Sequence, residues 1–209
     1  MSQLENKKHL IYILGTLAFF LFTVADTIIK IIGDFYKDTV IFSIASISAV
    51  IPVLFYLLYR RSFKEVKTTN YKLHIIRGIL MTLTYYFIVK GIILLPLSIA
   101  YPIILSAPVL LSLLGIIILK EKIYISKVIS LVLAMSAVLI VSGFSLNQGF
   151  NQMGVLFLIL GVISLACLDF TVRVYGKSER TVALTFYSML FTGIVFFIFV
   201  WGNSSPITP

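Results

Sequence analysis

The chain has 209 residues, of which 60% are hydrophobic and only 12% are charged, and its mean hydropathy is +1.08. Soluble domains are typically about 45–50% apolar and about 25% charged. The apolar surface is therefore too large for one aqueous core, and most of it must face lipid or pack within a helical bundle. The net charge of +9 suggests nucleic acid as a partner, but the basic residues lie in short segments between apolar runs. That placement argues against nucleic acid and for membrane topology.

Seven apolar stretches are long enough to cross about 30 Å of hydrocarbon as α-helices. They predict an all-α integral membrane protein whose surface contacts the lipid bilayer. The first stretch resembles a signal peptide because Lys7 and Lys8 precede it, but it is too long, contains charged residues and lacks a small-residue cleavage site. The predicted spans are 10–32, 39–59, 73–95, 97–119, 125–144, 153–172 and 183–201.

The distribution of lysine and arginine predicts the orientation of these spans. Of the 17 basic residues, 14 fall on one side of the predicted membrane and three on the other. By the positive-inside rule we expect a multi-pass protein of the cell inner membrane with a cytoplasmic amino terminus and an external carboxyl-terminal tail. The 14 residues are Lys7, Lys8, Arg60, Arg61, Lys64, Lys67, Lys72, Arg77, Lys120, Lys122, Lys127, Arg173, Lys177 and Arg180, and the other three are Lys30, Lys37 and Lys90.

An internal repeat relates the first predicted span to the sixth. An acid, a base and a glycine occur at identical spacing in both, 143 residues apart: Asp26, Lys30 and Gly33, then Asp169, Arg173 and Gly176. If the repeat unit has five spans, the second copy enters the membrane from the opposite side, and such inverted repeats let a central site open alternately to either side. We therefore predict a first five-helix repeat at 10–144 and the start of a second repeat, with two helices only, at 153–209. Chance similarity between two apolar helices is the alternative.

Five short motifs are spread over almost the whole chain. They are His74-Ile-Ile-Arg77-Gly78, Pro96-Leu-Ser-Ile-Ala100 followed by Pro108, Leu119-Lys-Glu121-Lys122, Leu168-Asp169, and Phe186-Tyr187-Ser188. Together they resemble the drug/metabolite transporter superfamily, EamA type, and around Arg77 and Asp169 the bacterial S-adenosylmethionine uptake transporters. The resemblance implies a ten-helix permease or exchanger of two inverted repeats that holds a small-molecule substrate between them. Against that pattern the chain is expected to be shortened at its carboxyl terminus, without helices eight to ten.

Two acidic residues lie inside predicted spans, where a charge costs about 2.5–3.5 kcal/mol at a helix centre. Asp26 and Asp169 each have a base four residues further on, Lys30 and Arg173, on the same helical face. One interpretation is an intrahelical ion pair that steadies the end of each helix. The other is a site for substrate or for proton coupling, with Asp26 toward the outside and Asp169 toward the inside.

Arg77 and three tyrosines complete the candidates for the substrate path or its gates. Arg77 either snorkels to the cytoplasmic interface or meets a carboxylate or phosphate of the substrate. Tyr85, Tyr86 and Tyr101 either pack in the core or stack on a planar base. The full set of candidates is Asp26, Lys30, Arg77, Tyr85, Tyr86, Tyr101, Asp169 and Arg173.

The remaining polar and special residues point to no other chemistry. Pro102 and Pro108 interrupt backbone hydrogen bonding within 97–119 and predict a kink there. His9 and His74 lie at the predicted cytoplasmic boundary, far apart in sequence, and indicate neither a metal site nor a catalytic pair. We predict no cofactor and no metal, and an enzyme is not expected because the chain has no phosphate-binding glycine loop and no catalytic motif.

Two hypotheses about function follow. The first is a secondary transporter that moves a small organic metabolite, S-adenosylmethionine by resemblance, across the membrane by alternating access. The second is a shortened product without transport activity, either a remnant or an assembly subunit, which the abrupt tail from Asn203 to Pro209 favours. Homo-oligomerisation would be one way to complete the bundle, although each copy would supply surplus helices.

Overall fold

The computed structural model describes residues 2–33, 35–61, 63–68, 70–121, 151–176 and 178–202, and seven separate positions between 125 and 140. The described part is helical and contains no strand. The predicted span 125–144 and the tail from Asn203 lie largely or wholly outside the described residues. The elements are α1 (Ser2–Ile32), α2 (Asp38–Arg60), the 3-10 helix η1 (Phe63–Val66), α3 (Tyr71–Leu94), α4 (Leu97–Ile104), α5 (Ala107–Leu119), α7 (Gln152–Tyr175) and α8 (Thr181–Gly202).

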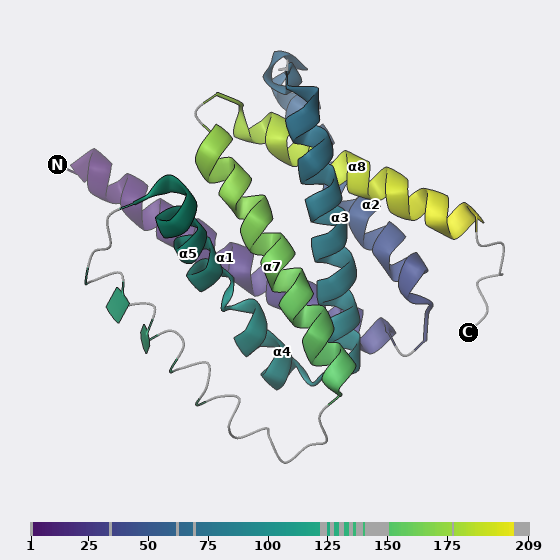
Figure 1. Ribbon diagram of the computed structural model, residues 1–209. Helices are drawn as coiled ribbons and strands as arrows, with labels where there is room; N and C mark the ends of the chain where they lie inside the picture. The colour runs from purple at the N-terminus through teal and green to yellow at the C-terminus, as the bar shows by residue number, and fades with distance from the viewer. Residues whose placement is uncertain are drawn as a thin grey trace.

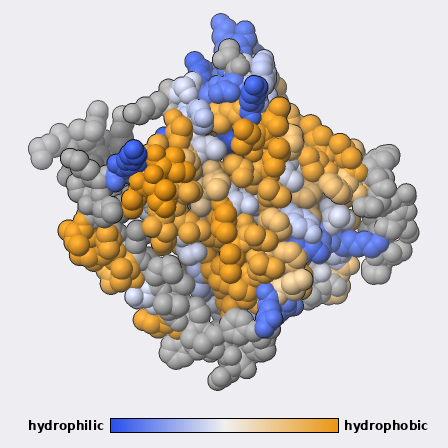
Figure 2. Space-filling model, viewed as in Figure 1, coloured by the Kyte–Doolittle hydropathy of each residue, from blue (hydrophilic) through white to orange (hydrophobic). Residues whose placement is uncertain are grey.

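Within the described residues, six helical segments are long and apolar enough to cross a membrane, which confirms the predicted all-α membrane fold class. They agree, to within a few residues at each end, with the six predicted spans that fall on described residues. Figure 2 shows apolar side chains across the middle of one face and hydrophilic side chains gathered at the end where α2 and α3 are connected. The six segments are Tyr12–Ile32, Asp38–Arg60, Tyr71–Leu94, Leu97–Leu119, Gln152–Tyr175 and Thr181–Val200.

The predicted kink in 97–119 is confirmed as a break between two helices. α4 ends at Ile104 and α5 begins at Ala107. Pro108 lies in the first turn of α5, where a residue without an N–H is tolerated, and Pro102 lies inside α4. The turn between the helices is closed by backbone hydrogen bonds, including one of 2.8 Å from the Leu105 N–H to the Tyr101 carbonyl.

Side-chain caps and glycines determine where several helices begin and end. Asn70 accepts a hydrogen bond from the Leu73 N–H at 3.3 Å at the start of α3, and Asn151 caps α7 in the same way. Gly33 and Gly176 follow the last residues of α1 and α7, and each donates its N–H to the carbonyl four residues earlier. The glycines of the proposed repeat thus have the same local role, while the division into two repeats stays a prediction.

α3 lies at the centre of the described bundle and packs most extensively against α7, beside it in Figure 1. α3 also contacts α8, α1, α2 and α4, and α2 packs against α8. The core between α3, α4 and α7 contains Ile92, Leu95, Ile99, Ala100 and Leu158, all 3% exposed or less. α1 lies largely outside this core, so its many exposed apolar side chains are suited to contact with lipid.

Small residues allow α3 and α7 to approach closely. A Cβ added to Gly161 of α7 would lie 2.7 Å from a side-chain carbon of Ile88 and 3.1 Å from its backbone nitrogen. Gly91 of α3 faces Leu158 with a similar lack of space. Glycine is therefore needed at these positions for contact between the two helices.

Candidate functional site

Asp26 lies at a polar cluster between α1, α3 and α4. The hydroxyl of Tyr101, which lies in α4, donates a hydrogen bond of 2.9 Å to Asp26 Oδ2. Thr23 also bonds to Tyr101, and Tyr85 of α3 interacts electrostatically with Asp26. The structure therefore brings together three predicted site residues, Asp26, Tyr85 and Tyr101, from separate helices.

Lys30 does not form the intrahelical ion pair with Asp26 that one interpretation of the sequence required. Its ammonium instead donates a hydrogen bond to the backbone carbonyl of Ile93, near the end of α3. Carbonyls in the last turn of a helix lack intrahelical partners and carry partial negative charge, which favours a cation there. Lys30 thus fastens the end of α1 to the end of α3.

Arg77 belongs to a second polar cluster, between the start of α3 and the end of α7. Its side chain is only 5% exposed and donates hydrogen bonds to the Leu168 carbonyl, at 3.0 Å, and to the Thr171 hydroxyl. Asp169 lies close enough to Arg77 for electrostatic interaction. The Nε of Arg77 has no hydrogen-bond partner in the described part of the chain. The guanidinium is thus buried against α7, and which of the two roles Arg77 has stays a prediction.

Arg173, like Lys30, does not form the intrahelical ion pair that one interpretation of the sequence requires. Its Nε lies 3.4 Å from Glu121 Oε1, which follows the end of α5, and the pair lies directly over Gly115. Asp169 is exposed and makes no salt bridge among the described residues. In both matched segments, therefore, the base binds another helix or its flank and not the acid one turn earlier.

Tyr86 packs among aromatic rings, as one of its two predicted alternatives expects. Its ring lies 5.5 Å from Phe42, 5.4 Å from Phe87 and 6.4 Å from Phe157, measured between ring centroids. Phe42 in turn stacks on Phe196 of α8 at 4.8 Å. Such aromatic clusters stabilise helix contacts, and in this one the half-buried Tyr86 packs against phenylalanine rings.

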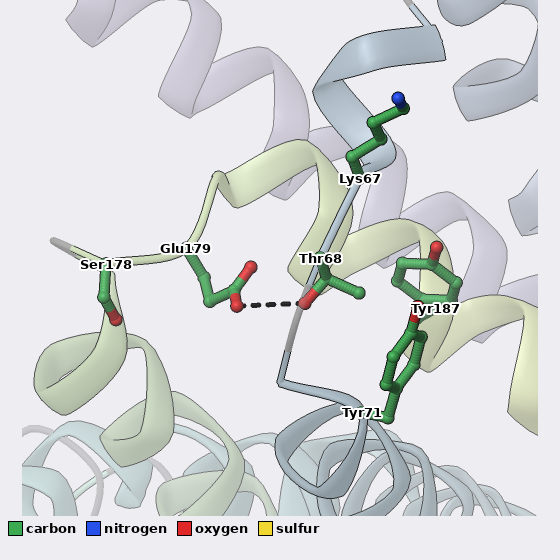
Figure 3. A pocket seen from close by; sticks show the side chains of 6 residues that line it. All are labelled: Lys67, Thr68, Tyr71, Ser178, Glu179 and Tyr187. Atoms are coloured by element: carbon green, nitrogen blue, oxygen red, sulfur yellow. Dashed lines mark hydrogen bonds between the residues drawn. The ribbon is translucent and has the colours of Figure 1, made fainter.

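A further polar contact joins two connections that lie far apart in sequence. Thr68, between η1 and α3, donates a hydrogen bond of 2.9 Å to Glu179, between α7 and α8, and His74 lies 3.0 Å from the Thr68 hydroxyl. Beside this contact is a cavity of about 460 Å³ that both connections line (Figure 3). The sequence analysis did not predict this contact or the cavity. The available signal was Glu179 itself, one of only eight acidic residues, in a connection otherwise rich in bases. The cavity is lined by Lys67, Thr68, Tyr71, Ser178, Glu179 and Tyr187.

Loss of the Tyr101 hydroxyl is expected to lower stability modestly. Tyr101→Phe leaves the half-buried Asp26 without its donor, at a cost of about 1–2 kcal/mol. For a chain of this size that corresponds to a fall in melting temperature of roughly 2–8 °C. Thermal unfolding in detergent measures this fall in melting temperature. Tyr12→Phe is the control, because Tyr12 is 72% exposed and loss of its hydroxyl should have little effect. Equal melting temperatures for both variants would contradict the contribution assigned to this hydrogen bond.

Comparisons with known proteins bear on the first two thirds of the chain. The model of the EamA-like transporter family matches residues 9–143. The matched segment includes Asp26, Lys30, Arg77 and the three tyrosines, whereas Asp169 and Arg173 lie beyond it. Searches of curated proteins and of solved structures give no match.

Proposed function

We propose, from the premise that this chain belongs to the EamA-like transporter family, that it is a secondary transporter of a small organic metabolite and works by alternating access. The family lies in the drug/metabolite transporter superfamily, and the six apolar helical segments agree with a multi-pass membrane protein. The charge of its connections supports an inner-membrane location with the amino terminus in the cytoplasm.

The observation that carries this proposal is a pair of polar clusters built on one helix, α3. Arg77 and Tyr85 belong to α3 and are separated by about 12 Å along its axis, from the rise of about 1.5 Å per residue. Arg77 contacts the end of α7 near Asp169, and Tyr85 lies by Asp26 on α1. Charged groups within membrane spans are costly and are retained where they serve a substrate or ion path.

The charges of these clusters support a substrate that carries both a positive and a negative group. Asp26 and Asp169 would attract a cation, and the buried guanidinium of Arg77 would attract a carboxylate or phosphate. A tyrosine ring beside Asp26 would suit a planar group. S-adenosylmethionine has a sulfonium, an α-amino acid and a purine, so it combines these features. It is the first substrate to test, and the choice of this compound rests on the sequence resemblance.

Direct uptake measurements test the proposal. Cells expressing residues 1–209 are given radiolabelled S-adenosylmethionine and a panel of amino acids and nucleotides, and membrane abundance is quantified in the same cells. Saturable uptake of one of these compounds would support transport by the chain. Normal insertion without uptake of any of them would contradict the proposal for this substrate class.

Asp169→Asn is expected to lower uptake by up to about fivefold, since an exposed ion pair contributes up to about 1 kcal/mol. Membrane abundance should stay unchanged, because the substitution keeps the shape of the side chain. Glu65→Gln makes the same chemical change in η1, outside the candidate spans, and should leave uptake unaffected. Equal losses of uptake and abundance would instead assign Asp169 a structural role.

The shortened, non-transporting alternative gains no support from the described residues, and homo-oligomerisation stays a prediction. Blue-native electrophoresis of the expressed chain examines both. A single discrete oligomer would support assembly of several copies, and a monomer that still takes up substrate would contradict it.

A further inference from the structure

The contact between Thr68, His74 and Glu179, which we name the inner latch, joins the connection before α3 to the connection before α8. Thr68 donates to Glu179 Oε1 at 2.9 Å, and His74 Nε2 lies 3.8 Å from Glu179 Oε2. The His74 and Glu179 side chains are only 5% and 10% exposed. A buried polar contact of this kind is satisfied only while the two connections stay together.

α8 supports the same contact from a second side. The Tyr187 hydroxyl donates a hydrogen bond of 3.0 Å to the carbonyl of Val66 in η1, and its ring lies 4.6 Å from the His74 ring. The segment before α3 is thus held by a side chain of α8 as well as by the connection that precedes α8. Movement of α7 and α8 away from α3 would break both attachments together.

The opposite end of α3 carries a second attachment, made to different helices. Lys90 forms an ion pair with Asp38 at the start of α2, and Lys30 of α1 donates to the Ile93 carbonyl. We name this the outer latch. The polar attachments at the two ends of α3 therefore have different partners: α1 and α2 at one end, and α8 with the connection before it at the other.

We propose that the inner latch is a gate of the substrate path on the side predicted to be cytoplasmic, a role that rests on the transport function proposed above. When the latch is closed, Thr68 donates to Glu179 and lies within hydrogen-bond distance of His74 Nε2, while His74 Nδ1 has no partner among the described residues. When the latch opens, water can satisfy these groups, so both states are accessible. The cavity beside it, seen in Figure 3, brings solvent to one side of the Thr68 and Glu179 contact even in the closed state. The outer latch holds the other end of α3 to α1 and α2.

A reversible cross-link tests the gate by holding the two connections together in place of the native contact. Thr68→Cys and Glu179→Cys are combined in a Cys167→Ser background, since Cys167 is the only native cysteine, and are joined by a short bis-methanethiosulfonate reagent. We expect uptake to fall at least tenfold and to return on reduction. Each single-cysteine variant is compared with itself before treatment, and the reagent should not change its uptake. A cross-linked protein that transports at the rate of the reduced protein would overturn the gate, because a merely structural contact tolerates being locked.

Hydrogen exchange in lipid nanodiscs provides a measurement that needs no uptake. Glu179→Gln should raise exchange severalfold in its own connection and also at Val66 to Thr68, because the latch couples the two. Glu65→Gln should leave the connection before α8 unchanged. Faster exchange confined to the connection that carries the substitution would overturn the latch. Coupled exchange in a chain that takes up none of the tested compounds would count against the transport function and not against the latch.

Discussion

Arg77→Gln is expected to lower substrate uptake by about 10- to 100-fold. Hydrogen bonds from a charged group contribute about 1.5–3 kcal/mol, and about 1.4 kcal/mol corresponds to a factor of ten. Arg77 is buried, and its guanidinium donates to the Leu168 carbonyl and to Thr171. Its replacement removes the one cation of this cluster that could meet an anionic group of the substrate. Initial uptake rates over a range of substrate concentrations measure the effect, normalised to membrane abundance.

Two further variants separate substrate binding from helix packing at this position. Arg77→Lys keeps the charge but not the planar set of donors, so uptake should fall less than in Arg77→Gln. Arg180→Gln removes an exposed base on the same predicted side of the membrane and should have little effect. If Arg77→Gln transports as well as the unmodified chain, Arg77 has no part in the substrate path. If its abundance falls in parallel with uptake, Arg77 serves the contact between α3 and α7.

Gly161→Val is expected to destabilise the helix bundle by about 1–3 kcal/mol, which for this chain length is a fall in melting temperature of roughly 2–12 °C. Even a single added carbon would lie 2.7 Å from the Ile88 side chain and 3.1 Å from the Ile88 backbone nitrogen. The backbone nitrogen cannot turn away as a side chain can, so α3 and α7 must separate. Thermal unfolding in detergent, followed by size-exclusion chromatography, detects this loss.

Gly15→Val is the matched control, since Gly15 also lies inside an apolar helix that is a candidate membrane span. Nothing lies within 4 Å of a Cβ added at Gly15, so this substitution should be tolerated. The comparison removes effects of helix propensity and hydropathy, which the two substitutions share. Similar melting temperatures for both variants would show that α3 and α7 are not closely packed at Gly161.

The resemblance and the structure together suggest how a transport cycle would use α3. Its two latches attach its two ends to different segments of the chain. A substrate bound between the clusters at Asp26 and Arg77 would lie between these attachments. The cross-link at Thr68 and Glu179 therefore tests the part of the mechanism on which the proposed path most depends.

Membrane spans and helix ends could be predicted because they depend on local composition. Twenty consecutive apolar residues must cross the bilayer as a helix, whatever their neighbours are, since hydrocarbon offers no hydrogen bonds to the backbone. The kink was likewise visible in the sequence, because Pro108 lacks an N–H wherever it stands. Asp26, Tyr85 and Tyr101 could be named as polar residues within spans, although nothing local indicated that they meet.

Only the tertiary structure decided which partners the charged residues take. Spacing places Lys30 and Arg173 one turn from an acid, yet Lys30 bonds to the end of α3 and Arg173 pairs with Glu121. Thr68 and Glu179 are 111 residues apart and carry no shared pattern. Hydrogen bonds and ion pairs act over a few ångströms, so they depend on which helices approach each other and in which rotation. In this chain those approaches include α1 with α3 and α5 with α7, and such helix packing depends on glycines and side-chain shape as well as on hydropathy.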